Sequence, residues 1–212
     1  MWAIDGTWLD RPAPPLARRA LLVAELHSRQ TLCLRPVTGE CVAEAERVLL
    51  ELFDQHGTPL VLKLDNGSGF IAARLGAVCC ERGVTLLHSP PRQPRWNGTC
   101  EVSVRWAKRR VETAWLARGG EGGYVAADLE AATTFVGPMA RVDEGVRERF
   151  LGLVDEQLAI AAAERGLVIG DVSEDHVRRS LGRVAVRRAL QTCHILSIEG
   201  RRYRQWFPPS VA

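Results

Sequence analysis

The sequence lacks any uninterrupted apolar run of the roughly 20 residues that a membrane-spanning helix requires. Its opening segment, Met1 to Asp10, has no basic stretch followed by an apolar one, so no secretory signal is visible. Repeats and low-complexity segments are also absent. Its residues are 46% hydrophobic and 25% charged, as in an ordinary globular protein. We therefore expect a cytoplasmic protein of one or two domains.

The cysteines lack the spacing of a metal or redox site. No two of them form a Cys-x-x-Cys pair, and no histidine pair at zinc spacing accompanies them. In a reducing compartment such cysteines usually act as small buried hydrophobic residues. We expect this role for Cys33, Cys41, Cys79, Cys80, Cys100 and Cys193.

The net charge of +3 is too small to indicate a nucleic-acid partner, but the charge is unevenly distributed. Residues 1–118 hold 16 Lys or Arg against 12 Asp or Glu, a balance of +4. Residues 119–172 hold 4 against 10, giving −6, and residues 173–212 hold 8 against 3, giving +5. A basic body and a basic tail around an acidic middle allow contact with a phosphate backbone, but most such charge runs are simply solvated faces.

Apolar periodicity and turn residues predict the order β-β-β-α-β-α-β-loop-α for the first half of the chain. The predicted strands are Trp2–Leu9, Ala20–His27, Thr31–Val37, Leu60–Leu64 and Val84–His88. The predicted helices are Cys41–His56, Phe70–Arg82 and one from Gly98 or Thr99 to Ala117. A proline-rich turn, Arg11–Pro15, ends the first strand, and Ser89–Asn97 is a loop. This order favours an α/β fold, a ribonuclease-H-like mixed five-stranded sheet flanked by helices.

A glycine-rich stretch marks the clearest predicted domain boundary. Residues 119–124 are expected to form a flexible hinge between a core of residues 1–118 and a mainly helical region of residues 125–212. In that region, helices are predicted over Val125–Val136, Gly145–Arg165 and Ser173–Cys193, followed by a basic, strand-like segment, Ile195–Phe207.

Three acids stand where this fold would bring them together. Asp5 lies within the first strand, Asp65 ends the fourth, and Glu101 lies in the first turn of the long helix. Sites form at the carboxyl ends of strands in such sheets. Taken singly, Asp65 could belong to a turn and Glu101 could simply favour a helix N-terminus. Asp5 is harder to dismiss, because a strand interior is a poor place for an unpaired carboxylate.

The segments around these acids carry recognisable motifs. Trp2 to Thr7 reads W-x-x-D-x-T, and His27-Ser28-Arg29 matches an aromatic-Ser-Arg hairpin with His27 at the aromatic position. Leu64 to Phe70 contains D-N-G-x-x-F, and Pro90 to Glu101 fits P-x(n)-N-G-x-x-E. Thirty-five residues separate Asp65 from Glu101. Over Trp2 to Trp115 the chain thus resembles the catalytic core of the DDE transposase and retroviral integrase superfamily, of the bacterial insertion-sequence type.

The resemblance implies a catalytic mechanism. Asp5, Asp65 and Glu101 would be the catalytic residues and the ligands of two Mg²⁺ (or Mn²⁺) ions, with Asp5 bridging both. Two such ions can hold the attacking and leaving oxygens of an in-line phosphoryl transfer, and they prefer carboxylate oxygens. The implied reaction is cleavage at the 3′ end of an element followed by attack of the freed 3′-hydroxyl on target DNA.

DNA contacts are expected beside the triad. Arg105, Lys108 and Arg109 follow Glu101 along a helix that in related enzymes lies against DNA, although a solvated face is the alternative. Arg92 and Arg95 precede that helix in the loop. Asn97 either caps the helix or contacts DNA.

The expected partners are DNA, as element ends and target, and further copies of the chain, in the bacterial cytoplasm at the nucleoid and without a membrane. No helix-turn-helix precedes Asp5, although related bacterial transposases commonly carry one upstream, and no zinc module like that of retroviral integrases is present. A separate end-recognition partner is therefore one possibility. The alternatives are a truncated or domesticated DNA-binding or assembly protein without independent activity, and a nuclease of the same fold, which the N-G-x-x-E motif disfavours.

Overall fold

The computed structural model describes residues 1–26, 28–38, 42–64, 69–89, 98–134, 142–167 and 174–192. The strands are β1 (Trp2–Ala13), β2 (Ala17–Glu25), β3 (Gln30–Val37), β4 (Val61–Leu64) and β5 (Thr85–His88). The helices are α1 (Val42–His56), α2 (Gly69–Glu81), α3 (Gly98–Ala117), α4 (Ala126–Glu130), α5 (Glu144–Ala163) and α6 (Glu174–Thr192). Within these ranges, no helix is long and apolar enough to cross a membrane.

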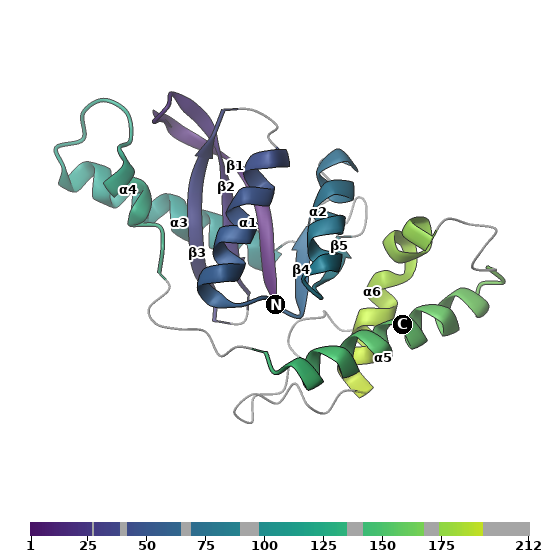
Figure 1. Ribbon diagram of the computed structural model, residues 1–212. Coiled ribbons are helices and arrows are strands. Elements are labelled where there is room, and N and C mark those ends of the chain that lie inside the picture. Colours follow the sequence, from purple (N-terminus) through teal and green to yellow (C-terminus); the bar gives the residue numbers. More distant parts are fainter. Residues whose placement is uncertain are drawn as a thin grey trace.

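The five strands form one sheet in the order β3-β2-β1-β4-β5 (Figure 1). The pairs β1–β2 and β2–β3 are antiparallel, whereas β1–β4 and β4–β5 are parallel. The short β2–β3 link suits an antiparallel hairpin, and the crossovers through α1 and α2 suit parallel neighbours. The predicted mixed five-stranded sheet flanked by helices is thus confirmed.

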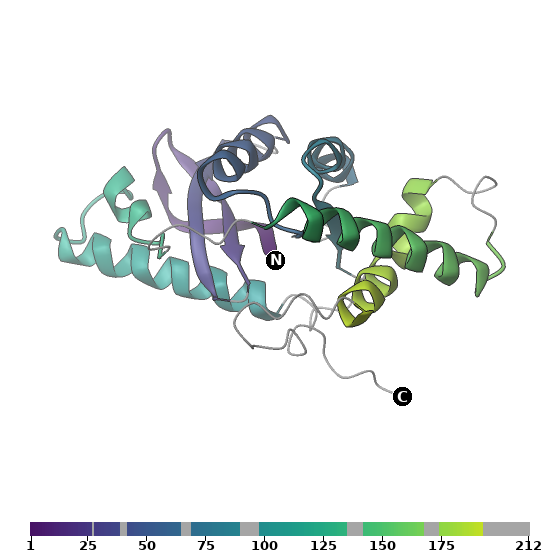
Figure 2. The same cartoon turned by 60° about the horizontal axis from the view of Figure 1, so that its bottom comes forward.

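Side-chain alternation along β1 separates two apolar layers. Ile4 belongs to a buried cluster with residues of α1 and α2, whereas Leu9 packs on the opposite face with Val111 of α3. Figure 2 shows α1 and α2 on one side of the sheet and α3 on the other. A third cluster joins Leu87 of β5 to Phe150 of α5. Burial of each such large side chain contributes about 1.5–3 kcal/mol relative to exposure.

The β1–β2 hairpin is longer than the sequence predicts. β1 continues through the predicted turn to Ala13, and the turn itself lies at residues 14–16. The β1–β2 register shifts between Trp8 and Ala13, and such an irregularity accommodates Pro12, which has no N–H to donate. The carbonyl of Pro12 accepts from the backbone N–H of Tyr124 at 2.9 Å, so the hairpin also contacts the chain beyond α3.

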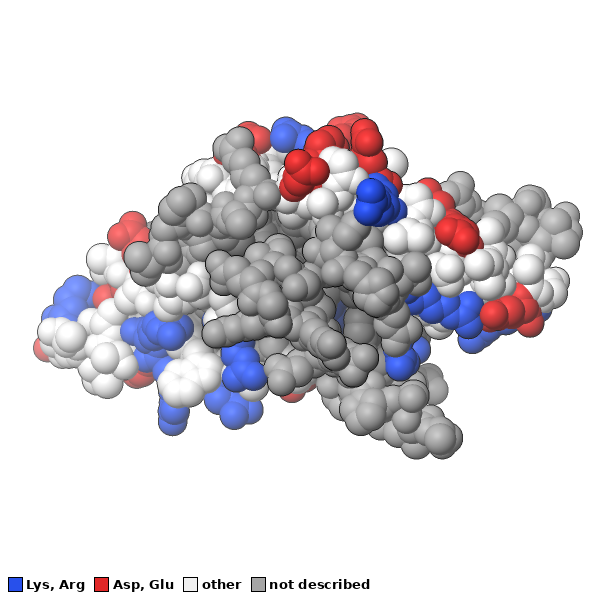
Figure 3. Space-filling model, turned by 90° about the horizontal axis from the view of Figure 1, so that it is seen from below, with Lys and Arg blue, Asp and Glu red and all other residues white. Residues whose placement is uncertain are grey.

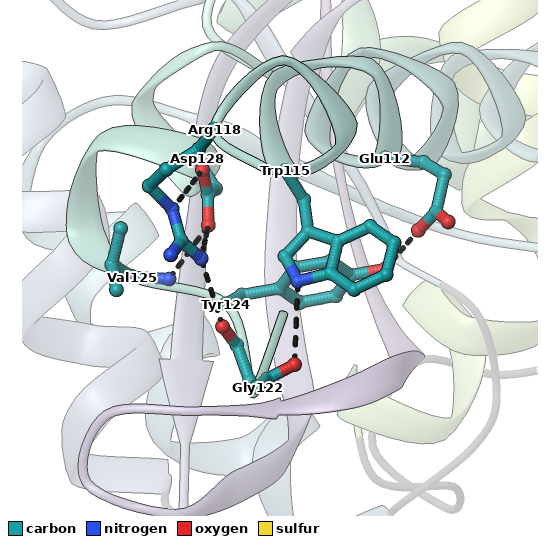
Figure 4. Close-up of polar contacts among 8 residues, drawn as sticks. Glu112, Trp115, Arg118, Gly122, Tyr124, Val125 and Asp128 are labelled. Atoms are coloured by element: carbon teal, nitrogen blue, oxygen red, sulfur yellow. Dashed lines mark hydrogen bonds and ion pairs between the residues drawn. The ribbon is translucent and has the colours of Figure 1, made fainter. Parts of the chain in front are cut away.

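The glycine-rich segment returns the chain to the sheet. A Cβ at Gly123 would lie 2.4 Å from the Pro12 carbonyl oxygen, so only glycine permits this approach. Trp115 donates from Nε1 to the carbonyl of Gly122 at 3.3 Å (Figure 4). The predicted hinge role of residues 119–124 and the division at this point stay predictions. In the structure, Leu129 of α4, beyond the segment, packs in the same cluster as α3.

The predicted helix Val125–Val136 is wrong in its extent, because α4 ends at Glu130. The chain beyond α4 instead bonds to the sheet edge. Thr134 donates its backbone N–H to the carbonyl of Thr31 in β3, and its Oγ1 accepts from the N–H of Thr31, both at 3.0 Å. Residues 133 and 134 belong to no helix, so the chain has left α4 before it meets β3.

α5 and α6 form a helix pair beside β4 and β5. The Asp143 side chain caps α5 by accepting from the N–H of Val146 at 3.2 Å. Arg147, in the first turn of α5, is only 4% exposed. Its guanidinium donates to backbone carbonyls of Thr58, Pro59 and Gly83 at 2.9, 3.2 and 2.8 Å. α5 is thus anchored to the loops that precede β4 and β5.

The expectation that the cysteines are buried holds for only part of the set. Cys79 and Cys100 are buried and Cys33 is half-buried, but Cys80 is exposed. Cys79 and Cys80 are adjacent on α2, and consecutive helix positions point about 100° apart, so only one of them faces the sheet. Cys41 and Cys193 lie outside the described residues.

Candidate active site

Asp5 lies at the point where β1 stops pairing with β4. The last residue pair between β1 and β4 is Ile4 with Leu64, whereas β1 still pairs with β2 at Asp5, opposite Leu22. The Asp5 side chain therefore emerges at the carboxyl end of β4, on the face toward α3. Its Oδ2 accepts from the Cys100 thiol, with 3.8 Å between Sγ and Oδ2. This carboxylate faces the start of α3.

Glu101 reaches the same region through the first turn of α3. Its neighbour Cys100 is buried in a small cluster with Ala3 of β1 and Leu26. Anchored in this way, the first turn presents Glu101 as an exposed side chain beside β1. A carboxylate at this position is favoured by the helix dipole.

The third predicted acid, Asp65, lies outside the described residues. In the sequence it follows Leu64, the last residue of β4. Among the residues that the structure does describe, no group of three His, Cys, Asp or Glu side chains could hold a metal ion. The structure thus brings the segments of Asp5 and Glu101 together, and the complete ligand set stays a prediction.

Lys63 is a charged neighbour of both acids that the sequence analysis did not single out. It is only 9% exposed. In the sheet it lies between Ala3 of β1 and Leu87 of β5, on the face that carries Asp5. Burial lowers the pKa of Lys63, and the charges of Cys100, Asp5 and Glu101 oppose that shift. The sequence offers one signal for this role of Lys63, because a lysine inside a short apolar strand, two residues before Asp65, is unusual.

The outer face of α3 is basic beyond Glu101. Arg105 and Arg109 are exposed, and the Arg109 guanidinium lies 5.5 Å from the ring centroid of Trp106, which is 51% exposed. Figure 3 shows basic side chains gathered over this side of the molecule. Lys108 instead pairs with Asp10 of β1 at 2.9 Å. The predicted DNA contacts Arg92, Arg95 and Asn97 lie outside the described residues.

The far end of α3 is tied to the core and to α4. Tyr124 donates its hydroxyl to Glu112 Oε2 at 2.8 Å (Figure 4). Arg11 pairs with Glu112 at 3.3 Å and stacks 3.6 Å from the Trp115 ring centroid. Arg118 forms an ion pair with the buried Asp128, and this hydrogen-bonded pairing holds the pKa of Asp128 below its usual value. These contacts fix the direction of α3 and thus the position of its first turn.

No protein-family model matches the sequence. Among solved structures, the catalytic core domain of BIV integrase aligns with 69% of this chain and 92% of its own, at 22% identity and a TM-score of 0.49. A chain of the simian T-cell lymphotropic virus intasome, solved with PP2A regulatory subunit B56 gamma, aligns at 17% identity and a TM-score of 0.52. That alignment covers 62% of this chain and 45% of the intasome chain. Taken with the sheet order and the helices on both faces, the likeness to the intasome chain shows the fold of this chain, a ribonuclease-H-like mixed sheet of the integrase-core type.

Proposed function

We propose that the chain is a DDE polynucleotidyl transferase, a transposase or integrase that cleaves 3′ ends and transfers strands in DNA transposition or integration. One observation carries the proposal. In an integrase-type fold, the Cys100–Asp5 contact sets the turn that bears Glu101 against the strand that bears Asp5. The predicted third ligand, Asp65, is next in sequence to the end of β4.

The donor chemistry fits hard divalent cations. Asp5, Asp65 and Glu101 would supply only carboxylate oxygens, the ligands that Mg²⁺ and Mn²⁺ prefer. Two bound ions would stabilise the charge on the attacking and leaving oxygens of a phosphoryl transfer. In this proposal the chain's own part is to hold the three carboxylates at one sheet edge and to orient the DNA. The β1–α3 contact supports the first of these roles.

The basic face of α3 supports a DNA substrate. Arg105 and Arg109 are exposed on the helix that carries Glu101, and in this proposal they contact phosphates next to the reacting bond. The same proposed interface includes Arg92, Arg95, Asn97 and Lys108. Lys108 can contribute only if DNA displaces its exposed partner, Asp10. Multimeric assembly on paired DNA ends, a helix-turn-helix partner that recognises them and a nucleoid location complete the proposal.

Plasmid nicking in Mn²⁺ tests the function without knowledge of the element ends. Asp5→Asn, Asp65→Asn and Glu101→Gln should each lower the rate at least about 100-fold, the order of effect of removing one electrostatic stabiliser from an active site. Glu148→Gln, an equivalent change at an exposed acid of α5, should leave the rate unchanged. Equal rates in all five proteins would instead favour the alternative, a DNA-binding or assembly protein without turnover. If inverted repeats flank the gene, strand transfer is then measured with these as the DNA ends.

A further inference from the structure

Lys63 is built into the sheet directly beside the proposed metal site. The register places its Cα opposite that of Ala3, which belongs to one buried cluster with Cys100, and the Cys100 thiol contacts Asp5. Asp5 is two residues beyond Ala3 on the same face of β1. The lysine therefore lies between β1 and β5, on the sheet face that carries Asp5, with little access to solvent.

A charged group in such a place requires compensation. An ammonium buried without a partner is strongly destabilising, so buried lysines are normally paired. Asp5 and Glu101 are the carboxylates whose charges act on Lys63 in the described part of the chain. These same two acids are the proposed metal ligands. The Lys63 ammonium and the metal ions would therefore interact with the same two carboxylates.

We propose that Lys63 is a built-in counter-ion of the acidic site, which compensates Asp5 and Glu101 before metal binds and thereby weakens the binding of divalent cations. The inference rests on the proposed metal-dependent function. Its physical basis is Coulombic. Like charges a few ångströms apart in a partly buried site repel strongly, so a fixed ammonium opposes a divalent ion that approaches the same carboxylates.

Calorimetric titration of Mn²⁺ into the DNA-free protein tests the inference. Lys63→Met removes the charge and keeps most of the side-chain volume, and it should tighten Mn²⁺ binding by about tenfold or more, equivalent to about 1.4 kcal/mol. Lys63→Arg keeps the charge and should bind Mn²⁺ much like the unmodified protein. The matched control is Arg47→Met, which likewise removes one positive charge, from an exposed arginine of α1 on the opposite face of the sheet.

The outcomes separate this inference from the proposed function. If Asp5→Asn abolishes Mn²⁺ binding and Lys63→Met leaves it unchanged, the counter-ion role is overturned, whereas the proposed metal site is supported. Tighter Mn²⁺ binding in Lys63→Met and not in Arg47→Met supports the role. Absence of Mn²⁺ binding in every variant overturns the proposed metal-dependent function, and the inference with it.

A metal-free measurement covers the case in which Lys63→Met fails to fold. If Lys63 compensates Asp5, then Asp5→Asn should raise the melting temperature more in the Lys63→Met background than in the unmodified protein. A double variant that folds where Lys63→Met does not supports the coupling. Equal effects of Asp5→Asn in both backgrounds, or no recovery of folding in the double variant, overturn it, because independent groups give additive changes.

Discussion

The guanidinium of Arg147 donates to the carbonyl of Gly83 at 2.8 Å, and this contact joins the start of α5 to the turn before β5. Two further carbonyls, of Thr58 and Pro59, accept from the same group. Because all three carbonyls lose their donor in Arg147→Met, we expect a loss of about 2–5 kcal/mol in the free energy of unfolding, measured by urea denaturation. Glu144→Gln removes only the 3.6 Å ion pair of Arg147 with an exposed acid and should cost less than about 1 kcal/mol. Similar losses in both variants would contradict the anchoring role.

Gly83 itself should tolerate no side chain. Its φ is +62°, and a Cβ would lie 2.8 Å from Cδ of Arg147. The control is Gly166→Ala, where φ is +65° and the added Cβ meets nothing within 4 Å. We expect Gly83→Ala to lower the free energy of unfolding by about 1–3 kcal/mol more than Gly166→Ala. Both variants place a side chain on a left-handed backbone, but only the one at Gly83 also overpacks. Equal melting temperatures for the two variants would show that Arg147 moves aside freely.

Tyr124 should make stability pH-dependent in alkali. Its burial, together with its bond to Glu112, raises the pKa of Tyr124 from 10.0 to about 12. Between these values the unfolded chain has lost the phenolic proton while the folded chain keeps it, so stability falls as pH rises. The contribution is complete below pH 10 and is lost toward pH 12. Tyr124→Phe should flatten the decline of the urea midpoint over this window, and parallel curves for the two proteins would contradict the assignment.

The adjacent thiols Cys79 and Cys80 should differ in reactivity within one molecule. Cys79 is 1% exposed, and burial raises its pKa to about 12, whereas Cys80 is exposed. Since the thiolate is the reactive form, alkylation of the folded protein near pH 8 should label Cys80 and spare Cys79. Peptide mass spectrometry reads the ratio, and labelling in urea provides the reference in which both react. Equal labelling without urea would show that α2 opens locally.

The arginines on α3 should contribute to DNA affinity through phosphate contacts. Arg105→Gln and Arg109→Gln should each weaken binding across sequences and reduce the slope of log K against log salt by about one. Arg47→Gln provides the control, since it removes one charge from an exposed arginine of α1, on the opposite face of the sheet. Fluorescence anisotropy at several salt concentrations measures the slopes. An equal reduction for Arg47→Gln would indicate unspecific electrostatic attraction.

The arrangement of elements was predictable because each rests on local patterns. The apolar spacing of α1 and the alternation along β1 follow from burial of one face, and the short links fix which strands pair. The hairpin was predicted too short because Pro12 was taken as a strand end, and the bulge that accommodates it depends on β2. The end of α4 likewise depends on Thr31, far away in the sequence.

The candidate site was predictable only as a set of motifs. Asp5, Asp65 and Glu101 stand in recognisable local contexts, and their joint role stays a prediction. Lys63 and Arg147 escaped notice because their importance arises from partners distant in the chain. The register between β1 and β4 makes Lys63 a neighbour of the acids, and backbone carbonyls, which no side-chain pattern reveals, make Arg147 an anchor.

The paired bonds between Thr31 and Thr134 have a consequence for association. β3 is an outer strand of the sheet, and the unpaired backbone groups of such a strand are a template for another chain's strand. With the N–H and carbonyl of Thr31 already bonded to Thr134, an incoming strand would find its ladder interrupted near the start of β3. The bonds between Thr31 and Thr134 therefore also disfavour pairing of β3 with a strand of another chain, and so disfavour aggregation.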